Sequence, residues 1–215
     1  DYMRDGDTLV VEPGTYLPFD LGQRRVVIQG QNPFAPPVVD ASRHDGGYAL
    51  LFPDFCRGAP ATPPAEGPTT PPGITIAGDQ GPETVLDTLR VTGGDTDRGG
   101  GILILDAAPQ LINLAVDSNR AVDGGGIYVE GTDPDFNGAT LQNVTIQQNT
   151  ATNPEVLGGG GGIYANAPIA ITSSQIIGNV AEIRGGGIYA NSLNQPAGMG
   201  AIAVTISGSQ IAENS

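Results

Sequence analysis

Residues 160–179 read GGGIYANAPIAITSSQIIGN, and both halves of this stretch recur along the chain. The first half, three glycines followed by Ile, occurs at 99–102, 124–127, 160–163 and 185–188. In the last three copies a tyrosine follows the Ile: Tyr128, Tyr164 and Tyr189. The copies are spaced by 25, 36 and 25 residues, a period typical of repeat architectures, so the sequence predicts a repeat protein.

The second half of the stretch places apolar residues or Ser at fixed steps before an Asn. Four copies end in an Asn and a fifth ends in Gly94. The leucine-rich repeat has the same pattern, but its units continue into a helix or a 3₁₀ segment. Here each unit continues into glycines, which are poor helix formers, and then into alternating residues such as those at 127–130. The repeats therefore favour an all-β fold, a parallel β-helix solenoid of about seven to eight coils.

Equivalent residues of successive coils in such a solenoid lie about 4.8 Å apart. We expect the Ile after each glycine run to form one interior column. A second interior column is expected from Val91, Val116, Ile146, Ile176 and Ile211. Stacked amides should form a structural ladder at a corner, from Asn119, Asn149, Asn179 and Asn214.

The three tyrosines alternate with the inward Ile residues and should therefore lie on the outer face of their sheet. We expect an exposed aromatic file of Tyr128, Tyr164 and Tyr189. Such a file either binds sugar rings or another protein, or shields the sheet by cross-strand stacking.

The whole chain, 1–215, fits one β-helix domain. Irregular N-terminal coils are expected over 1–42, an external Pro-rich loop over 43–73, and regular repeats over 74–215. The chain begins at Asp1 and stops in mid-pattern at Ser215, so we interpret it as a fragment of a longer protein.

Composition argues against several functional classes. The chain has 33 Gly and 18 Pro, the two poorest helix formers. Its net charge of −14 would repel phosphate backbones, so no nucleic-acid partner is expected. No apolar run approaches the ~18 residues of a membrane helix, so no membrane-spanning segment is expected. Cys56 is alone and cannot form an internal disulfide.

Several stretches resemble known proteins. Residues 5–16, DGDTLVVEPGTY, are similar to the opening coil of secreted right-handed parallel β-helix proteins of the pectate-lyase-like superfamily, and residues 81–94 resemble their second recurring stretch. The Asn-x-Ala turns and Gly-Gly-Gly-Ile-Tyr strands are similar to repeats of bacterial surface proteins, and polymorphic outer-membrane proteins carry a related Gly-Gly-x-Ile repeat. The resemblance implies a right-handed β-helix at the cell surface or outside the cell. It leaves function open, because this fold hosts lyases, hydrolases, epimerases, tailspikes and adhesins.

Catalytic and metal-binding side chains are sparse. The resemblance implies Arg or Lys beside calcium-binding carboxylates in lyases of this fold, and clustered Asp with His and Arg-x-Lys in its hydrolases. The chain has no Lys and one His, His44, so we assign no catalytic residue. Calcium is the one cofactor considered, because three Asp-x-Asp strings offer oxygens, at 5–7, 95–97 and 133–135. None forms a complete calcium loop, so we expect ordinary turns and no metal site.

These observations favour a non-catalytic, extracellular or cell-surface β-helix with a structural or adhesive role. Its expected partners are glycans or other surface proteins. One alternative is a polysaccharide-active lyase, hydrolase or epimerase of the pectate-lyase-like class, with catalytic residues in the Pro-rich loop or outside this segment. Another is a self-assembling filament subunit that associates end to end through unpaired strand edges.

Overall fold

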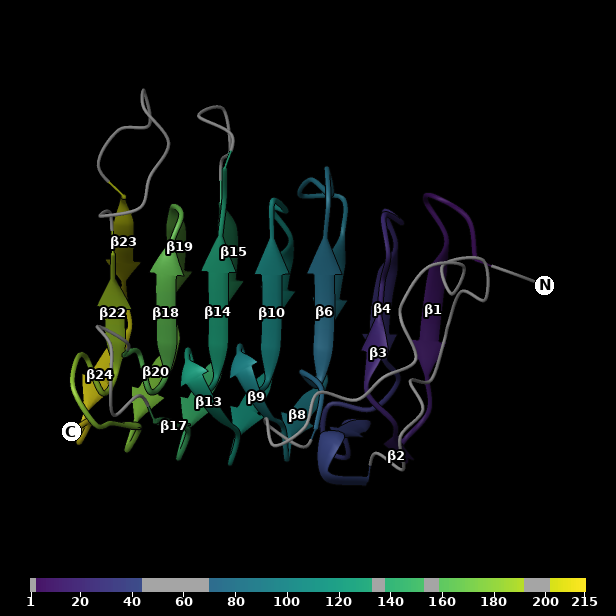
Figure 1. Ribbon diagram of the computed structural model, residues 1–215. Coiled ribbons are helices and arrows are strands. Elements are labelled where there is room, and N and C mark those ends of the chain that lie inside the picture. The colour runs from purple at the N-terminus through teal and green to yellow at the C-terminus, as the bar shows by residue number, and fades with distance from the viewer. Residues whose placement is uncertain (1–2, 44–69, 133–137, 153–158, 192–201) are drawn as a thin grey trace, which may run out of the picture.

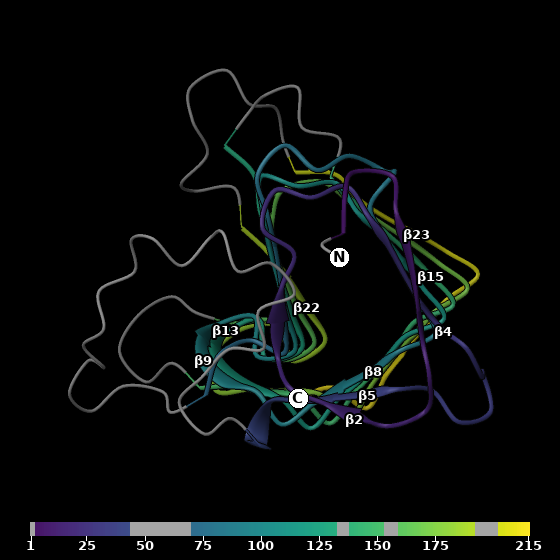
Figure 2. The ribbon, with the colours of Figure 1, turned by 90° about the vertical axis from the view of Figure 1, so that its right-hand side faces the viewer.

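The strands of this protein are short and stack into parallel sheets along one axis. The computed structural model describes residues 3–43, 70–132, 138–152, 159–191 and 202–215. Within these ranges, neighbouring strands of every sheet come from successive turns of the chain (Figure 1). Viewed along the axis, the coils superimpose (Figure 2). The structure confirms the predicted all-β parallel β-helix, with about seven coils.

Each complete coil passes through four sheets in the order A, B, D, C. Sheet A contains β1 (Thr8–Val11), β4 (Val27–Gly30), β7 (Val85–Asp87), β11 (Gln110–Ile112), β15 (Ala139–Gln142), β19 (Ile169–Thr172) and β23 (Val204–Ser207). Sheet B contains β2 (Thr15–Tyr16), β5 (Val38–Asp40), β8 (Arg90–Thr92), β12 (Ala115–Asp117), β16 (Thr145–Gln147), β20 (Gln175–Ile177) and β24 (Gln210–Ala212).

The other two sheets are smaller. Sheet C contains β3 (Phe19–Asp20), β6 (Ile74–Ala77), β10 (Ile102–Leu105), β14 (Ile127–Glu130), β18 (Ile163–Asn166) and β22 (Ile188–Ala190). Sheet D contains β9 (Asp95–Arg98), β13 (Arg120–Asp123), β17 (Thr150–Ala151) and β21 (Val180–Ala181). A short 3₁₀ helix, η1 (Ala41–Arg43), follows β5.

The interior is filled by columns of apolar side chains that repeat once per coil. In sheet C the strands pair in the register that places Ile74, Ile102, Ile127, Ile163 and Ile188 side by side. In sheet B the register aligns the second column, Val39, Val91, Val116, Ile146, Ile176 and Ile211. Both expected columns are aligned by the strand register, and their members up to Ile163 and Ile176 belong to one continuous hydrophobic core. At the C-terminal end Ile188 is only partly buried against this core, and Ile211 is 46% exposed, so the prediction that Ile211 is interior is wrong.

The corners between sheets depend on residues with positive φ. Asn143 (φ +55°) forms the corner between sheets A and B in its coil, and Gln148 (φ +55°) the corner between B and D. Gly160 (φ +71°) turns the chain from sheet D into sheet C. A Cβ on Gly161 would overlap backbone oxygens of the next coil, so the glycine runs are a steric requirement of this corner.

The predicted external loop at 43–73 falls outside the described residues except at its ends. The chain is described again from Thr70, whose backbone N–H donates to the Asp95 oxygen at 3.1 Å, and β6 begins at Ile74. In the ranges that the structure describes, no helix is long and apolar enough to cross a membrane.

Candidate functional site

The three predicted tyrosines form a column on the outer face of sheet C. Strand pairing places Tyr128 opposite Tyr164, and Tyr164 opposite Tyr189. The Tyr128 and Tyr164 rings are stacked, with centroids 4.8 Å apart and 10° between their planes. Tyr164 and Tyr189 meet edge to face, with centroids 5.5 Å apart and 66° between planes. We refer to these three residues as the tyrosine column.

The structure corrects the expected exposure of two of these tyrosines, while Tyr189 is partly exposed. Tyr128 and Tyr164 are each only 6% exposed, although their side chains point away from the core. Each ring is covered by the next, and the guanidinium of Arg98 lies 5.4 Å from the centroid of the Tyr128 ring. Strand register alone predicts which face a side chain is on, but not which neighbours cover it.

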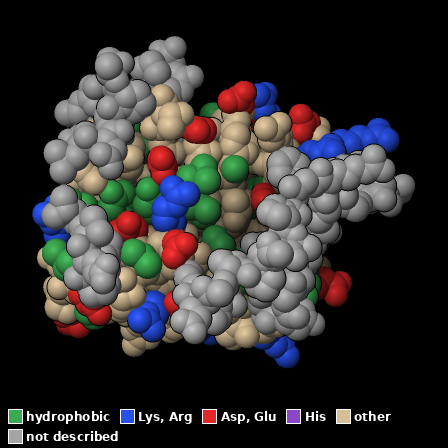
Figure 3. Space-filling model, in the orientation of Figure 1, with side chains coloured by type: hydrophobic (Ala, Val, Ile, Leu, Met, Phe, Trp, Pro, Cys, Tyr) green, Lys and Arg blue, Asp and Glu red, His purple; other side chains and the backbone are tan. Residues whose placement is uncertain are grey.

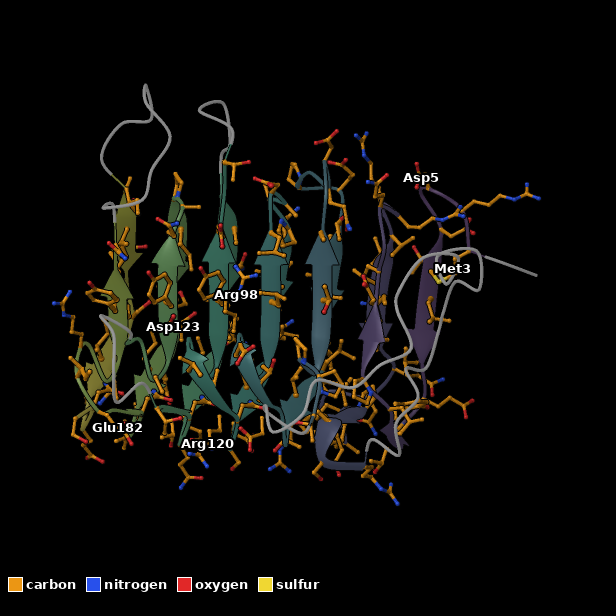
Figure 4. All side chains as sticks on the ribbon, in the orientation of Figure 1. Met3, Asp5, Arg98, Arg120, Asp123 and Glu182 are labelled. Carbon is orange, nitrogen blue, oxygen red and sulfur yellow. The ribbon has the colours of Figure 1, made fainter. Side chains whose placement is uncertain are left out.

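Charged side chains from sheet D stand beside the column. Arg98 ends β9 and lies next to Asp123 at the end of β13. Figure 4 shows both side chains over the face of sheet C, and Figure 3 shows basic and acidic side chains among hydrophobic ones on the same face. Arg98 Nη1 and the Tyr128 hydroxyl both donate to Glu130 Oε2, at 2.8 and 2.9 Å. The carboxylate of Glu130 thereby joins sheet D to the first ring of the column.

Polar side chains also hold the other two tyrosines. Asn191 Nδ2 donates to the Tyr164 hydroxyl at 2.6 Å. Arg184 Nη1 donates to the Tyr189 hydroxyl at 2.8 Å, and its guanidinium lies 5.7 Å from the centroid of that ring. The hydroxyl of every tyrosine in the column is therefore hydrogen-bonded to a neighbouring side chain.

Burial sets the protonation of these groups. Burial and the adjacent Glu130 carboxylate raise the pKa of Tyr128. Burial likewise raises the pKa of Tyr164, against the opposing hydrogen bond from Asn191. Desolvation raises the pKa of the Asp123 carboxyl, which the Gly159 N–H and the charge of Arg98 oppose. The phenols of Tyr128 and Tyr164 therefore stay protonated at neutral pH, so these two side chains can pack and hydrogen-bond but offer no phenolate nucleophile.

The charged partners of the tyrosines were not predicted from the sequence, although the sequence contains a signal for them. Arg98, Asp123 and Arg184 each stand directly before a glycine run. Arg98 lies over the Tyr128 ring and Arg184 over the Tyr189 ring, and Asp123 pairs with Arg98 in sheet D. A charged residue directly before Gly-Gly-Gly-Ile is therefore the sequence pattern that indicates these partners.

The four predicted asparagines lie at successive rungs of one ladder, at the corner between sheets B and D. The Nδ2 of each donates to the Oδ1 of the next: Asn119 to Asn149 at 3.0 Å, Asn149 to Asn179 at 2.9 Å, and Asn179 to Asn214 at 3.0 Å. The backbone N–H of each of the first three donates to the same oxygen. Asn149 and Asn179 are fully buried. The ladder thus satisfies polar groups that the solenoid interior would otherwise leave unpaired.

The calcium candidates lie in different kinds of local structure: the string at 95–97 is part of strand β9 and not of the expected turn, whereas the string at 5–7 begins in a turn. Asp5 Oδ1 accepts from the Arg25 N–H and Asp7 Oδ2 from the Arg4 N–H, so these carboxylates brace turns. The string at 133–135 lies outside the described residues, as do His44 and Cys56. In the part of the chain that the structure describes, no three His, Cys, Asp or Glu side chains converge as metal ligands would.

One segment of the chain matches a known family model. Residues 143–166 match the Chlamydia polymorphic membrane protein repeat. The segment runs from the corner after β15 to the end of β18, and it contains Asn149 and Tyr164. This match supports the resemblance to polymorphic outer-membrane proteins for one repeat, whereas the pectate-lyase-like resemblance stays a prediction. Neither curated proteins nor solved structures give a match to this chain.

Proposed function

We propose that this chain is part of a β-helix displayed at the cell surface, with a structural and adhesive role and no catalytic one. The observation that carries the proposal is the match of one coil, residues 143–166, to a repeat that is named for membrane proteins. The elements of that coil, a ladder Asn and a Gly-Gly-Gly-Ile-Tyr strand, recur in the neighbouring coils. An acidic coat of net charge −14 suits a protein that must stay soluble outside the cell.

In this proposal the tyrosine column stabilises the β-helix and does not bind a ligand. The Tyr128 and Tyr164 rings are stacked and buried, and the partly buried Tyr189 meets Tyr164 edge to face. All three hydroxyls are hydrogen-bonded to charged or amide side chains. Cross-strand aromatic pairs of this kind stabilise a sheet. The column would therefore join the sheet D corner to the outer face of sheet C, and ligand contacts would be made elsewhere on the surface.

Surface display is tested on intact cells that produce the full-length protein. Antibodies raised against residues 1–215 should label these cells without permeabilisation, and external protease should remove the signal. An antibody against a cytoplasmic protein of the same cells serves as the control for integrity. Labelling that requires permeabilisation contradicts the proposed location.

The absence of catalysis is tested with uronate polymers, incubated with the purified chain with and without calcium. We expect neither unsaturated ends nor new reducing ends, and the appearance of either would establish the enzymatic alternative. Light scattering at increasing protein concentration tests the filament alternative, which requires a mass that grows with concentration.

A further inference from the structure

One corner of the β-helix differs from its equivalents in later coils. Between β11 and β12 the chain turns from sheet A to sheet B through Asn113 (φ +53°), and between β15 and β16 through Asn143 (φ +55°). Between β4 and β5 the same corner is enlarged to residues 31–37, a loop that projects from the solenoid (Figure 2). This loop contains three prolines and Phe34.

The loop holds Phe34 in the solvent. Asn32 Oδ1 accepts the Phe34 N–H at 2.9 Å, and the Asn32 carbonyl accepts the Ala35 N–H at 3.2 Å, so the turn is braced by hydrogen bonds. The Phe34 residue is 97% exposed, more than any other large hydrophobic residue described. A phenyl ring gains free energy when an apolar surface covers it, and here the protein itself leaves it uncovered.

A groove of about 410 Å³ lies between this loop and the next coils. Pro33 and Pro36 line it on the loop side, and Thr88, Asn113, Asn143 and Thr145 are among the residues that line it on the coil side. Its volume lies within the usual range of ligand sites. No charged residue lines it.

The polar side of the groove repeats along the solenoid axis. Asn143 Nδ2 donates to Asn113 Oδ1 at 2.7 Å, and Asn113 Nδ2 donates to Asp87 Oδ1 at 2.8 Å. Unlike the buried ladder, Asn113 and Asn143 are exposed. An amide nitrogen carries two N–H groups, and each of these hydrogen bonds uses one of them. A second donor of each amide can therefore reach a ligand, at intervals of one coil, about 4.8 Å.

We propose that this groove binds a neutral glycan chain that lies along the solenoid axis, with Phe34 stacked against one sugar ring. Amides and hydroxyls pair with sugar hydroxyls, while an exposed aromatic ring covers the apolar face of a sugar. The uncharged lining and the net charge of −14 disfavour an anionic polymer. A peptide is a poorer fit, because the groove crosses successive coils and does not follow a free strand edge. The proposal is independent of the cellular location proposed above, since the isolated chain is expected to bind.

The test measures binding of maltohexaose, cellohexaose and hexa-N-acetylchitohexaose to the purified chain by titration calorimetry, with hexagalacturonate as the anionic comparison and a decaproline peptide as the protein-like one. We expect at least one neutral oligosaccharide to bind. Phe34→Ala should weaken that binding about tenfold, equivalent to about 1.4 kcal/mol. Ile183→Ala, which removes an exposed apolar side chain elsewhere, should leave it unchanged.

A second pair of variants tests the amides. Asn143→Gly removes a groove amide, and Gln148→Gly removes an exposed amide at the next corner; both positions have φ +55°, which glycine accepts without strain. Only Asn143→Gly should weaken binding. Failure of all three neutral oligosaccharides to bind, equal or tighter binding of hexagalacturonate or decaproline, or full affinity in Phe34→Ala would each overturn the proposal. Unchanged melting curves of the variants confirm that they are folded.

Discussion

Replacing Asn149 by Ala should destabilise this protein more than any exposed substitution. Its amide makes four hydrogen bonds within the buried ladder. Oδ1 accepts from the backbone N–H and the Nδ2 of Asn119, both at 3.0 Å, and Nδ2 donates to Asn179 Oδ1 and to the Val116 carbonyl, both at 2.9 Å. At a net ~1 kcal/mol each, their loss lowers the free energy of unfolding by about 4 kcal/mol.

The last described rung supplies a matched control. Asn214 accepts from the backbone N–H and Nδ2 of Asn179 and donates to the Ile176 carbonyl, but it is partly exposed. Water can replace these hydrogen bonds, so Asn214→Ala should cost only about 1 to 2 kcal/mol. The measurement is the unfolding midpoint and slope in urea for both variants and the unchanged chain. The reasoning fails if Asn149→Ala costs less than about 1 kcal/mol, or if the two substitutions cost the same.

An isosteric variant adds a signature that cavity formation cannot produce. In Asn149→Asp one carboxyl oxygen would face two acceptors, the Val116 carbonyl and Asn179 Oδ1. Burial and these acceptors would raise the pKa of the new carboxyl above its unfolded value of about 3.9. The native state then binds more protons than the unfolded chain. The free energy of unfolding therefore falls as the pH rises from the unfolded pKa through the raised native pKa. Parallel pH profiles of Asn149→Asp and Asn149→Ala would contradict this account.

Three further predictions concern the corner glycines, the tyrosine column and a buried carboxyl. Gly161→Ala should cost about 3 kcal/mol or more because its Cβ would overlap backbone oxygens, whereas Gly178→Ala, with φ +64° and open space around it, should cost about 1 to 2 kcal/mol; equal melting temperatures would contradict the steric argument. Tyr164→Ala should lower the free energy of unfolding by about 3 to 5 kcal/mol in urea titrations, because its ring is buried. A cost below about 0.5 kcal/mol would indicate that the ring is exposed, as the sequence pattern predicted. Burial raises the pKa of Asp20, against the hydrogen bond from Gly22, so Asp20→Asn should stabilise the protein at pH 7 and lose this gain at pH 3, where both side chains are neutral. A pH-independent effect of Asp20→Asn on the free energy of unfolding would contradict this prediction.

The repeat pattern was enough to predict the fold, because strand stacking turns sequence period directly into spatial register. Ile127, Ile163 and Ile188 stand one residue after a glycine run in every copy, and the sheets align them for that reason. The asparagine pattern likewise predicts which side chains meet. Both inferences need only the chain period and the strand spacing.

Only the tertiary structure decided what surrounds these columns. Alternation placed Tyr128 and Tyr164 on the outer face but could not show that Arg98 and the stacked rings cover them. The groove beside Phe34 could not be predicted from the sequence either, since it brings Pro33 and Pro36 against residues of later coils, from Thr88 to Thr145. The repeat period determines which equivalent residues stack along the axis. Whether a side chain is buried depends on how far the neighbouring corners extend over it. That extent is set by contacts between different sheets, which no single repeat encodes.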